Sequence, residues 1–146
     1  MAPRPPADAV VALRSLRRRF RGLFAGLGED ESPDDLAVRP GADGRSARDH
    51  VRAATTAMAE GAKALDAALG ATATDAARGE VGAGATVGAD VEDLAARADA
   101  VAARAEHVPA SEWARTGASA ALWAAVDAAV EHLRAAERTL DEVRGR

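Results

Sequence analysis

The sequence predicts an all-α fold, a four-helix bundle, and three observations support this prediction. Apolar residues recur at intervals of three and four along four separate segments, which is the spacing of a helix with one buried face. No segment shows the alternation typical of a half-buried strand. Alanine, the strongest helix former, dominates the 48% hydrophobic share. With 146 residues and a formal net charge of −4, the chain has the size of one domain, which we place at residues 7–146.

The first predicted helix begins at Ala7, after a proline-rich segment, residues 1–6, that we expect to be a flexible arm. We predict that this helix ends at Gly28 in a left-handed cap. Its apolar face consists of Val10, Leu13, Leu16, Phe20, Leu23 and Leu27. Its other faces carry five arginines, and an acidic segment, residues 29–35, follows directly. Because both charges are present and aromatic partners for bases are lacking, we expect local charge pairing and no binding of nucleic acid.

Two helix-start signals come next. Ser32 before Pro33, with a carboxylate three residues after the serine, predicts a short helical turn. Ser46 with Asp49 predicts a capping box that opens the second long helix, which we expect to end at Gly70. The apolar seam of this helix consists of Ala47, Val51, Ala54, Met58, Gly61, Leu65 and Ala68.

Residues 71–89 are rich in alanine, glycine and threonine and have no apolar period. Their glycine-rich part, residues 81–88, superficially resembles a dinucleotide-binding loop, but it lacks the buried strand before the glycines and the helix directly after them. We therefore expect a long crossover. At up to about 3.3 Å per residue it can span the bundle, so the second and third helices can run parallel in an up-down-down-up order.

The third predicted helix begins at Asp90, with Asp93 completing a capping box, and ends before Pro109. Its seam consists of Val91, Leu94, Ala98, Val101, Ala105 and Val108. We expect Trp113 to cover the end of the bundle before the fourth helix begins near Ser119. The seam of the fourth helix is the most regular in the chain and consists of Leu122, Val126, Ala129, Leu133, Ala136, Leu140 and Val143.

Composition excludes several classes of function. The chain has no cysteine, which rules out a disulfide scaffold, a thiolate nucleophile and a thiolate metal site. No apolar run approaches the length of a membrane span, and the arginine-rich start lacks the apolar core of a secretory signal. We therefore expect a cytoplasmic protein that does not bind membranes.

Four short motifs together resemble the DinB-like superfamily of four-helix bundles, which includes mycothiol-dependent maleylpyruvate isomerases and related thiol transferases. The motifs are residues 36–40 (LAVRP), 44–51 (GRSARDHV), 108–115 (VPASEWAR) and 131–134 (EHLR). Their order and spacing are similar to those of the family over most of residues 10–140. Arg45 stands where the family has a tryptophan.

The resemblance implies a divalent metal, zinc or nickel, held by three histidines at the positions of Ala53, His132 and Ala136. Of these three positions only His132 is a histidine and so a weak metal-ligand candidate. His50, one turn before Ala53, is a second weak candidate. The resemblance thus implies a bundle that has lost metal-dependent catalysis and binds a small molecule or a protein partner. We expect this site in the cleft between the second and fourth helices, lined by His50, Ala53, His132, Ala136 and Glu137.

Two alternatives remain open from the sequence. The first is a metal-dependent thiol S-transferase or isomerase with an altered ligand set, namely His50, His132 and a carboxylate such as Glu60 or Glu137. Burial of Glu137 would raise its pKa, although a glutamate so placed more often pairs with an arginine, such as Arg48 or one from the first helix. The second alternative is an interaction protein that forms a homodimer through its arginine-rich first helix.

Overall fold

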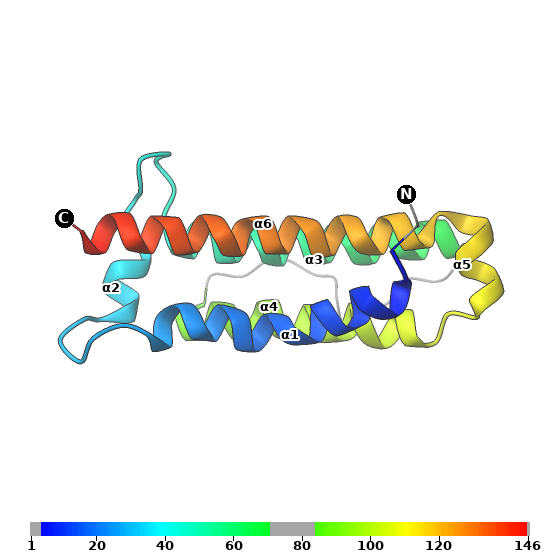
Figure 1. The fold of residues 1–146 in the computed structure, drawn as a ribbon, viewed down its shortest axis with the longest axis horizontal. Helices are drawn as coiled ribbons and strands as arrows, with labels where there is room; N and C mark the ends of the chain where they lie inside the picture. The colour runs from blue at the N-terminus through cyan, green and yellow to red at the C-terminus, as the bar shows by residue number, and fades with distance from the viewer. Residues whose placement is uncertain (1–3, 71–83, 146) are drawn as a thin grey trace.

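The computed structural model of the chain describes residues 4–70 and 84–145, and this described part contains helices and no strand. Four long helices lie side by side, and a short helix sits at each end of the molecule (Figure 1). The long helices are α1 (Pro6–Ala25), α3 (Ala47–Leu69), α4 (Val87–Glu106) and α6 (Ala118–Arg144). The short ones are α2 (Pro33–Ala37) and α5 (Ala110–Thr116). The prediction of an all-α fold is confirmed.

The core lies along the centre of the four long helices. Helix α3 packs most extensively on α6, α1 packs on α4, and the two pairs meet through α3 with α4 and α1 with α6. The predicted seams of α4 and α6 are buried at every position, and that of α3 at every position before its last residue, Ala68. The largest fully buried side chains include Leu13, Phe20, Met58, Leu94 and Leu122. Much of the remaining core is alanine, which lets the helices approach closely.

The ends of α3 form as their sequence signals predict. The Ser46 side chain accepts a hydrogen bond from Asp49 N, and the Asp49 carboxylate accepts one from Ser46 N, so both halves of the capping box are present. Gly70 ends the helix at φ 63°, the left-handed conformation that glycine adopts at low cost. The short helix α2 also starts as predicted, with Ser32 as its N-cap.

The predicted end of the first helix is wrong. Helix α1 ends at Ala25, and the next residue, Gly26, has φ −80° rather than a left-handed conformation. The backbone N–H of Gly28 instead donates to Glu31 Oε1 at 2.8 Å and begins the turn toward α2. The two glycines lie only two residues apart, and the helix stops at the earlier one because each glycine weakens a helix.

The predicted start of the third helix is also wrong, because α4 begins at Val87. Its N-cap is Thr86, whose Oγ1 accepts a hydrogen bond from Ala89 N at 3.1 Å. Asp90 cannot serve as the cap because its carboxylate is turned inward, toward Arg48 of α3. Most of the predicted crossover, including the greater part of its glycine run, lies outside the described residues.

Several contacts bring the α2 end of the molecule together. Arg144, at the end of α6, forms an ion pair with Glu31, which follows α1. Asp34 in α2 accepts a hydrogen bond at 2.7 Å from Val87 N, at the start of α4. At the other end, Arg4 of the predicted arm forms an ion pair with Asp127 of α6 at 2.7 Å.

Within the described residues, no helix is both long enough and apolar enough to span a bilayer.

Candidate functional site

Two of the predicted site residues, His50 and His132, meet where α3 faces α6. The Nδ1 atoms of the two rings are 3.2 Å apart, and the ring centres are 5.5 Å apart. A centre separation this much larger than the nitrogen separation means that the nitrogens point at one another rather than at a shared third atom. The contact is therefore a hydrogen bond between imidazoles, not the geometry of two ligands converging on one ion. His50 is 3% exposed, whereas His132 is half-buried.

Asp43, which the sequence analysis does not single out, extends this pair. Its Oδ2 lies 3.4 Å from His50 Nε2, on the side of the ring opposite His132. A turn holds it there: Gly44 N–H donates to Gly41 O, Gly44 has φ 79°, and Asp43 Oδ1 accepts from Arg45 N at 2.9 Å. The Asp-Gly pair just before the capping serine is a turn signal that could have identified this residue.

The surroundings of the cluster shift the pKa values of two of its members, Asp43 and His132. The hydrogen bond from Arg45 N lowers the pKa of Asp43, and the nearby His50 lowers it further. Burial lowers the pKa of His132, and His50 and Arg45 act in the same direction, while Glu131 opposes them. At neutral pH the cluster therefore contains an ionised carboxylate next to a neutral His132.

The other predicted site residues do not add ligands to the pair. Ala136 is fully buried and Ala53 is half-buried, and each offers only a methyl group. Glu137 is exposed and lines a shallow cavity beside Gly22 of α1, away from His50. Glu60 is exposed ten residues along α3 from His50, which is about 15 Å of helix. Within the described residues, no three His, Asp or Glu side chains come together in a way that could hold a metal ion.

Farther along the same helix pair, α3 and α6 are in close contact. A Cβ placed on Gly61 would lie 2.5 Å from the Cβ of Ala125, well inside van der Waals contact. Gly61 is buried and Ala125 is 3% exposed, so the two backbones approach directly. At this level, about two turns from His132 and Ala53, the two helices leave no space between their backbones.

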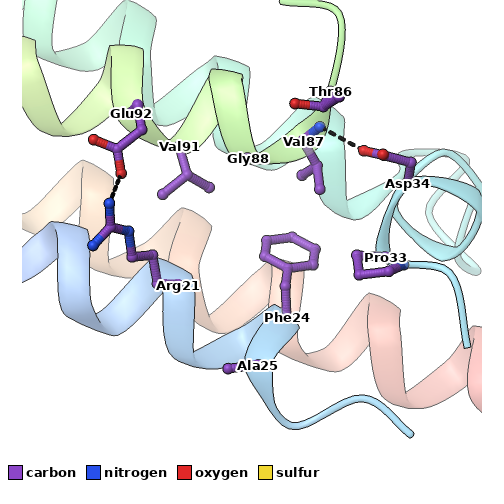
Figure 2. Close-up of a pocket in the computed structure, with 10 residues that line it drawn as sticks. All are labelled: Arg21, Phe24, Ala25, Pro33, Asp34, Thr86, Val87, Gly88, Val91 and Glu92. Atoms are coloured by element: carbon purple, nitrogen blue, oxygen red, sulfur yellow. Dashed lines mark hydrogen bonds and ion pairs between the residues drawn. The ribbon is translucent and has the colours of Figure 1, made fainter. Parts of the chain in front are cut away.

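Open space lies at another place, between the end of α1, the start of α2 and the start of α4. Figure 2 shows this cavity, which has a volume of about 690 Å³. Its walls are mainly apolar, and Phe24, Val87 and Val91 point into it. An ion pair between Arg21 and Glu92 stands at one side. This size falls within the range of about 300 to 1,000 Å³ that is usual for small-molecule sites.

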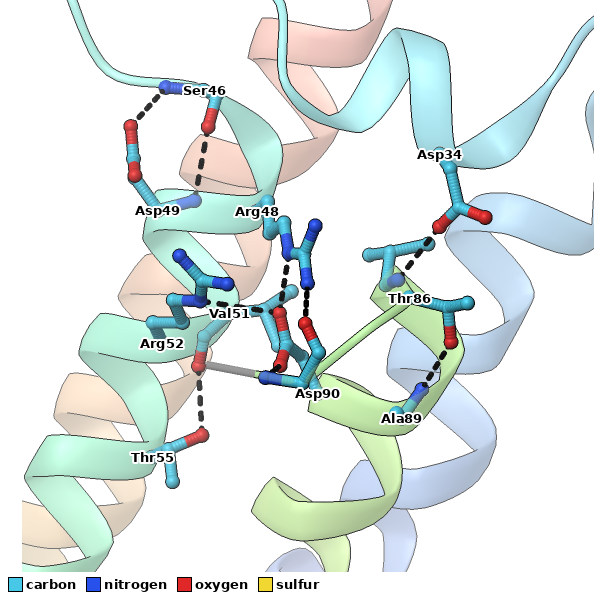
Figure 3. A network of polar contacts seen from close by, with 12 residues as sticks. Asp34, Ser46, Arg48, Asp49, Val51, Arg52, Thr55, Thr86, Ala89 and Asp90 are labelled. Atoms are coloured by element: carbon cyan, nitrogen blue, oxygen red, sulfur yellow. Dashed lines mark hydrogen bonds and ion pairs between the residues drawn. The ribbon is translucent and has the colours of Figure 1, made fainter. Parts of the chain in front are cut away.

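A second polar cluster lies on the face of α3 turned toward α4. Asp90 is 3% exposed, and its Oδ2 lies 2.6 Å from Arg48 Nε and 3.2 Å from Arg52 Nε (Figure 3). Its Oδ1 accepts a hydrogen bond from Gly84 N at 2.9 Å, and Arg48 also donates to Gly84 O. Arg48 is thus committed to Asp90, so the expectation that it pairs with Glu137 is wrong.

Two arginines of α1 pair with acidic residues of the neighbouring helix α4. Arg14 bonds Glu106 at 2.6 Å, and Arg17 bonds both Glu92 at 3.2 Å and Asp99 at 3.0 Å. The predicted charge pairing is present, although the partners are on α4 rather than in the acidic segment after α1. These pairs leave less of the first helix's charge available to a second copy of the chain.

Comparison with models of protein families gives no match, and comparisons with curated proteins and with solved structures give none either. Function therefore has to be inferred from the residues themselves. Two places are candidates for a functional site: the cluster of Asp43, His50 and His132, and the cavity between α1, α2 and α4.

Proposed function

We propose that this chain is a DinB-like four-helix bundle that has lost metal-dependent catalysis and binds a small molecule. The proposed helix order is up-down-down-up. It is supported by the α2 end of the molecule, where α3 and α4 both begin and α1 and α6 both end. There, Arg48 near the start of α3 meets Asp90 near the start of α4, while Arg144 at the end of α6 meets Glu31 just after α1.

The observation that carries the proposal is the state of the three positions at which the family resemblance implies metal ligands. Ala53 and Ala136 have no coordinating atom, and His132 Nδ1 is engaged by His50. An ion held between the two Nδ1 atoms would have to break the hydrogen bond between the imidazoles, and it would have no third protein ligand among the described residues. Loss of the ion is the simpler account of this arrangement.

We place the bound molecule in the cavity beside Phe24, because this cavity has apolar walls and a volume usual for small-molecule sites. The apolar walls favour a ligand with a compact apolar body. The ion pair between Arg21 and Glu92 at the rim offers both a donor and an acceptor to one polar group on that ligand.

A screen of small aromatic and aliphatic fragments by ¹H–¹⁵N NMR tests this placement. We expect the shifted amides to cluster around Phe24 and Gly88. The Gly88→Phe variant should abolish these shifts, since a side chain there meets only Thr86 at ordinary contact distance and can extend over the cavity. Ala89→Phe is the matched control, because Ala89 is exposed, adjacent, and not part of the lining. Shifts that persist in Gly88→Phe would refute the placement.

The second candidate function is a metal-dependent thiol S-transferase or isomerase, and one observation favours it: imidazoles from two different helices do meet. Calorimetric titration with zinc and with nickel distinguishes these two candidate functions. Our proposal expects no binding at micromolar metal. Micromolar affinity that disappears in His132→Ala would favour the transferase and contradict the metal-free bundle.

A further inference from the structure

The cluster of Asp43, His50 and His132 permits one consistent arrangement of protons. His50 Nε2 is buried and forms no hydrogen bond that meets the usual distance and angle limits; its nearest charged group is the carboxylate of Asp43, with Oδ2 at 3.4 Å. Because an ionised carboxylate can only accept a proton, we place the N–H of His50 on Nε2, toward Asp43. This leaves a lone pair on His50 Nδ1. His132 must then donate its Nδ1–H across the 3.2 Å contact, which leaves a lone pair on its own Nε2.

That lone pair lies at the more exposed end of the cluster formed by Asp43, His50 and His132. His50 is buried, whereas His132 is half-buried, and its Nε2 is on the part of the ring turned away from His50. Among the described residues, none forms a hydrogen bond with this nitrogen. Three charged groups act on the His132 ring or on its partner: Asp43, which lies beyond His50, Arg45 in the turn before α3, and Glu131, the neighbour of His132 on α6.

We propose that His132 is a catalytic nucleophile for small activated acyl esters, and that His50 and Asp43 are its positioning residues. This inference goes beyond the binding function proposed above and does not depend on it, since the cavity beside Phe24 lies elsewhere. A neutral imidazole nitrogen with a free lone pair attacks carbonyl carbon readily. Arg45, whose positive charge acts on His132, is the residue to which we assign stabilisation of the oxyanion that forms in the transition state.

The reaction proceeds in two balanced steps. First, His132 Nε2 forms a bond to the carbonyl carbon, and the alcohol oxygen leaves with the electron pair of the broken ester bond. The imidazole ring then carries a positive charge, which is relieved when the Nδ1 proton moves to His50 Nδ1. His50 becomes an imidazolium facing the carboxylate of Asp43, as histidine faces a carboxylate in hydrolytic triads, although Asp43 is exposed.

In the second step, water attacks the acyl carbon and the bond to Nε2 breaks. The electron pair returns to the ring, the proton on His50 goes back to His132 Nδ1, and the proton that the attacking water loses passes through solvent to the alkoxide released in the first step. The balance is one ester and one water consumed, and one carboxylic acid and one alcohol released. The cluster ends in its starting state, so each molecule of protein can act repeatedly.

Hydrolysis of p-nitrophenyl acetate, followed by the absorbance of released p-nitrophenolate, tests the proposal on the full chain. We expect a rate at pH 7 about tenfold or more above that of free 4-methylimidazole at equal concentration, because the ring is neutral and oriented. The His132→Gln variant should lose this excess. Two controls should keep it: His107→Gln, which removes the only histidine outside the cluster, and Lys63→Arg, which removes the only lysine.

The positioning residues need a readout that a merely structural role would not change. Asp43 is 53% exposed, so Asp43→Asn should leave the melting temperature unchanged. We expect it to lower kcat severalfold and to move the lower limb of the pH profile, because the carboxylate no longer stabilises the proton on His50. Asp43→Glu should restore part of the rate. Unchanged kcat and pH profile in Asp43→Asn would overturn this assignment.

A rate no greater than that of free imidazole, or a rate unaffected by His132→Gln, would overturn the proposal as a whole. If that variant fails to fold, diethyl pyrocarbonate on the native wild-type protein provides the test. We expect activity to fall in step with modification of His132, located by mass spectrometry, and not with that of the exposed His107. Full activity after complete modification of His132 would also reject the proposal.

Discussion

Two buried polar clusters flank the first two turns of α3, and they differ in how fully their hydrogen bonds are made. On the side toward α4, both oxygens of Asp90 are bonded, one to two arginines and the other to Gly84 N (Figure 3). On the side toward α6, His50 is equally buried, yet its contact with Asp43 is long at 3.4 Å. Satisfied networks stabilise a fold, whereas incomplete ones cost stability and tend to occur at sites of chemistry. We therefore assign the first cluster to folding and the second to function.

The largest expected effect comes from breaking the folding cluster. Asp90→Ala leaves the guanidinium of Arg48, only 14% exposed, without its partner, and should lower the free energy of unfolding by about 3 to 5 kcal/mol. Urea denaturation measures this change. Asp35→Ala, at an exposed acidic position with no buried partner among the described residues, is the control and should change stability little. A loss in Asp90→Ala no greater than in the control would contradict the structural assignment.

The next effect concerns the contact that brings α3 against α6 and so determines the distance between the two imidazoles. Gly61→Ala forces the helices apart and should cost about 1 to 3 kcal/mol despite the better helix propensity of alanine. Gly22→Ala, whose new Cβ meets nothing within 4 Å, should instead stabilise by about 0.5 to 1 kcal/mol. Thermal or urea unfolding measures both stability changes. Adding Ala125→Gly to Gly61→Ala should recover the lost stability, because it removes the Cβ that the new methyl group meets. A stability change of the same sign in Gly61→Ala and Gly22→Ala would contradict this packing of α3 on α6.

The contrast between the clusters also tells which features could be predicted from sequence. The buried seams of α4 and α6 could be predicted, because a periodic apolar pattern indicates which face of a helix is buried. The capping box at Ser46 could be as well, because its bonds are local. Asp90 was misassigned as a cap because its partners, Arg48 and Arg52, lie on another helix. Tertiary contacts of this kind leave no periodic or local signal.

The functional cluster shows the same division. His50 and His132 could be identified, since each lies on the flank of an apolar seam and the two seams were expected to face one another. For Asp43, the Asp-Gly pair signals only a turn; its contact with His50 could not be predicted, because that depends on how the turn before α3 folds back over the helix. The cavity beside Phe24 was not predicted either, since three separate chain segments form its walls.

A smaller effect is expected from pH. The folded pKa of His132 is lowered, so below about pH 6.5, its unfolded value, the unfolded chain binds more protons and stability falls as pH decreases through the folded pKa. Unfolding in urea across this range should show a positive slope of stability with pH. The slope should be shallower in His132→Gln and unchanged in the control His107→Gln. Equal slopes in all three proteins would remove the electrostatic argument for this site.

The smallest effect is expected at the surface ion pairs of α1. Arg14 and Glu106 are each nearly half exposed, so solvent and salt screen their attraction. Arg14→Ala should change the melting temperature barely more than experimental error. Sedimentation of the wild-type protein at low and high salt should show no change in mass, because these arginines are paired within the chain. Salt-sensitive dimers would instead favour the interaction protein considered from the sequence.

The central claim, that His132 donates Nδ1–H to His50 and keeps a bare Nε2, is tested most directly by long-range ¹H–¹⁵N NMR of the three histidine rings. At pH 7 we predict the Nδ1–H tautomer for His132 and the Nε2–H tautomer for His50, with both unchanged on addition of zinc. A proton on Nε2 of His132, or a zinc-induced shift of both Nδ1 signals, would contradict the account.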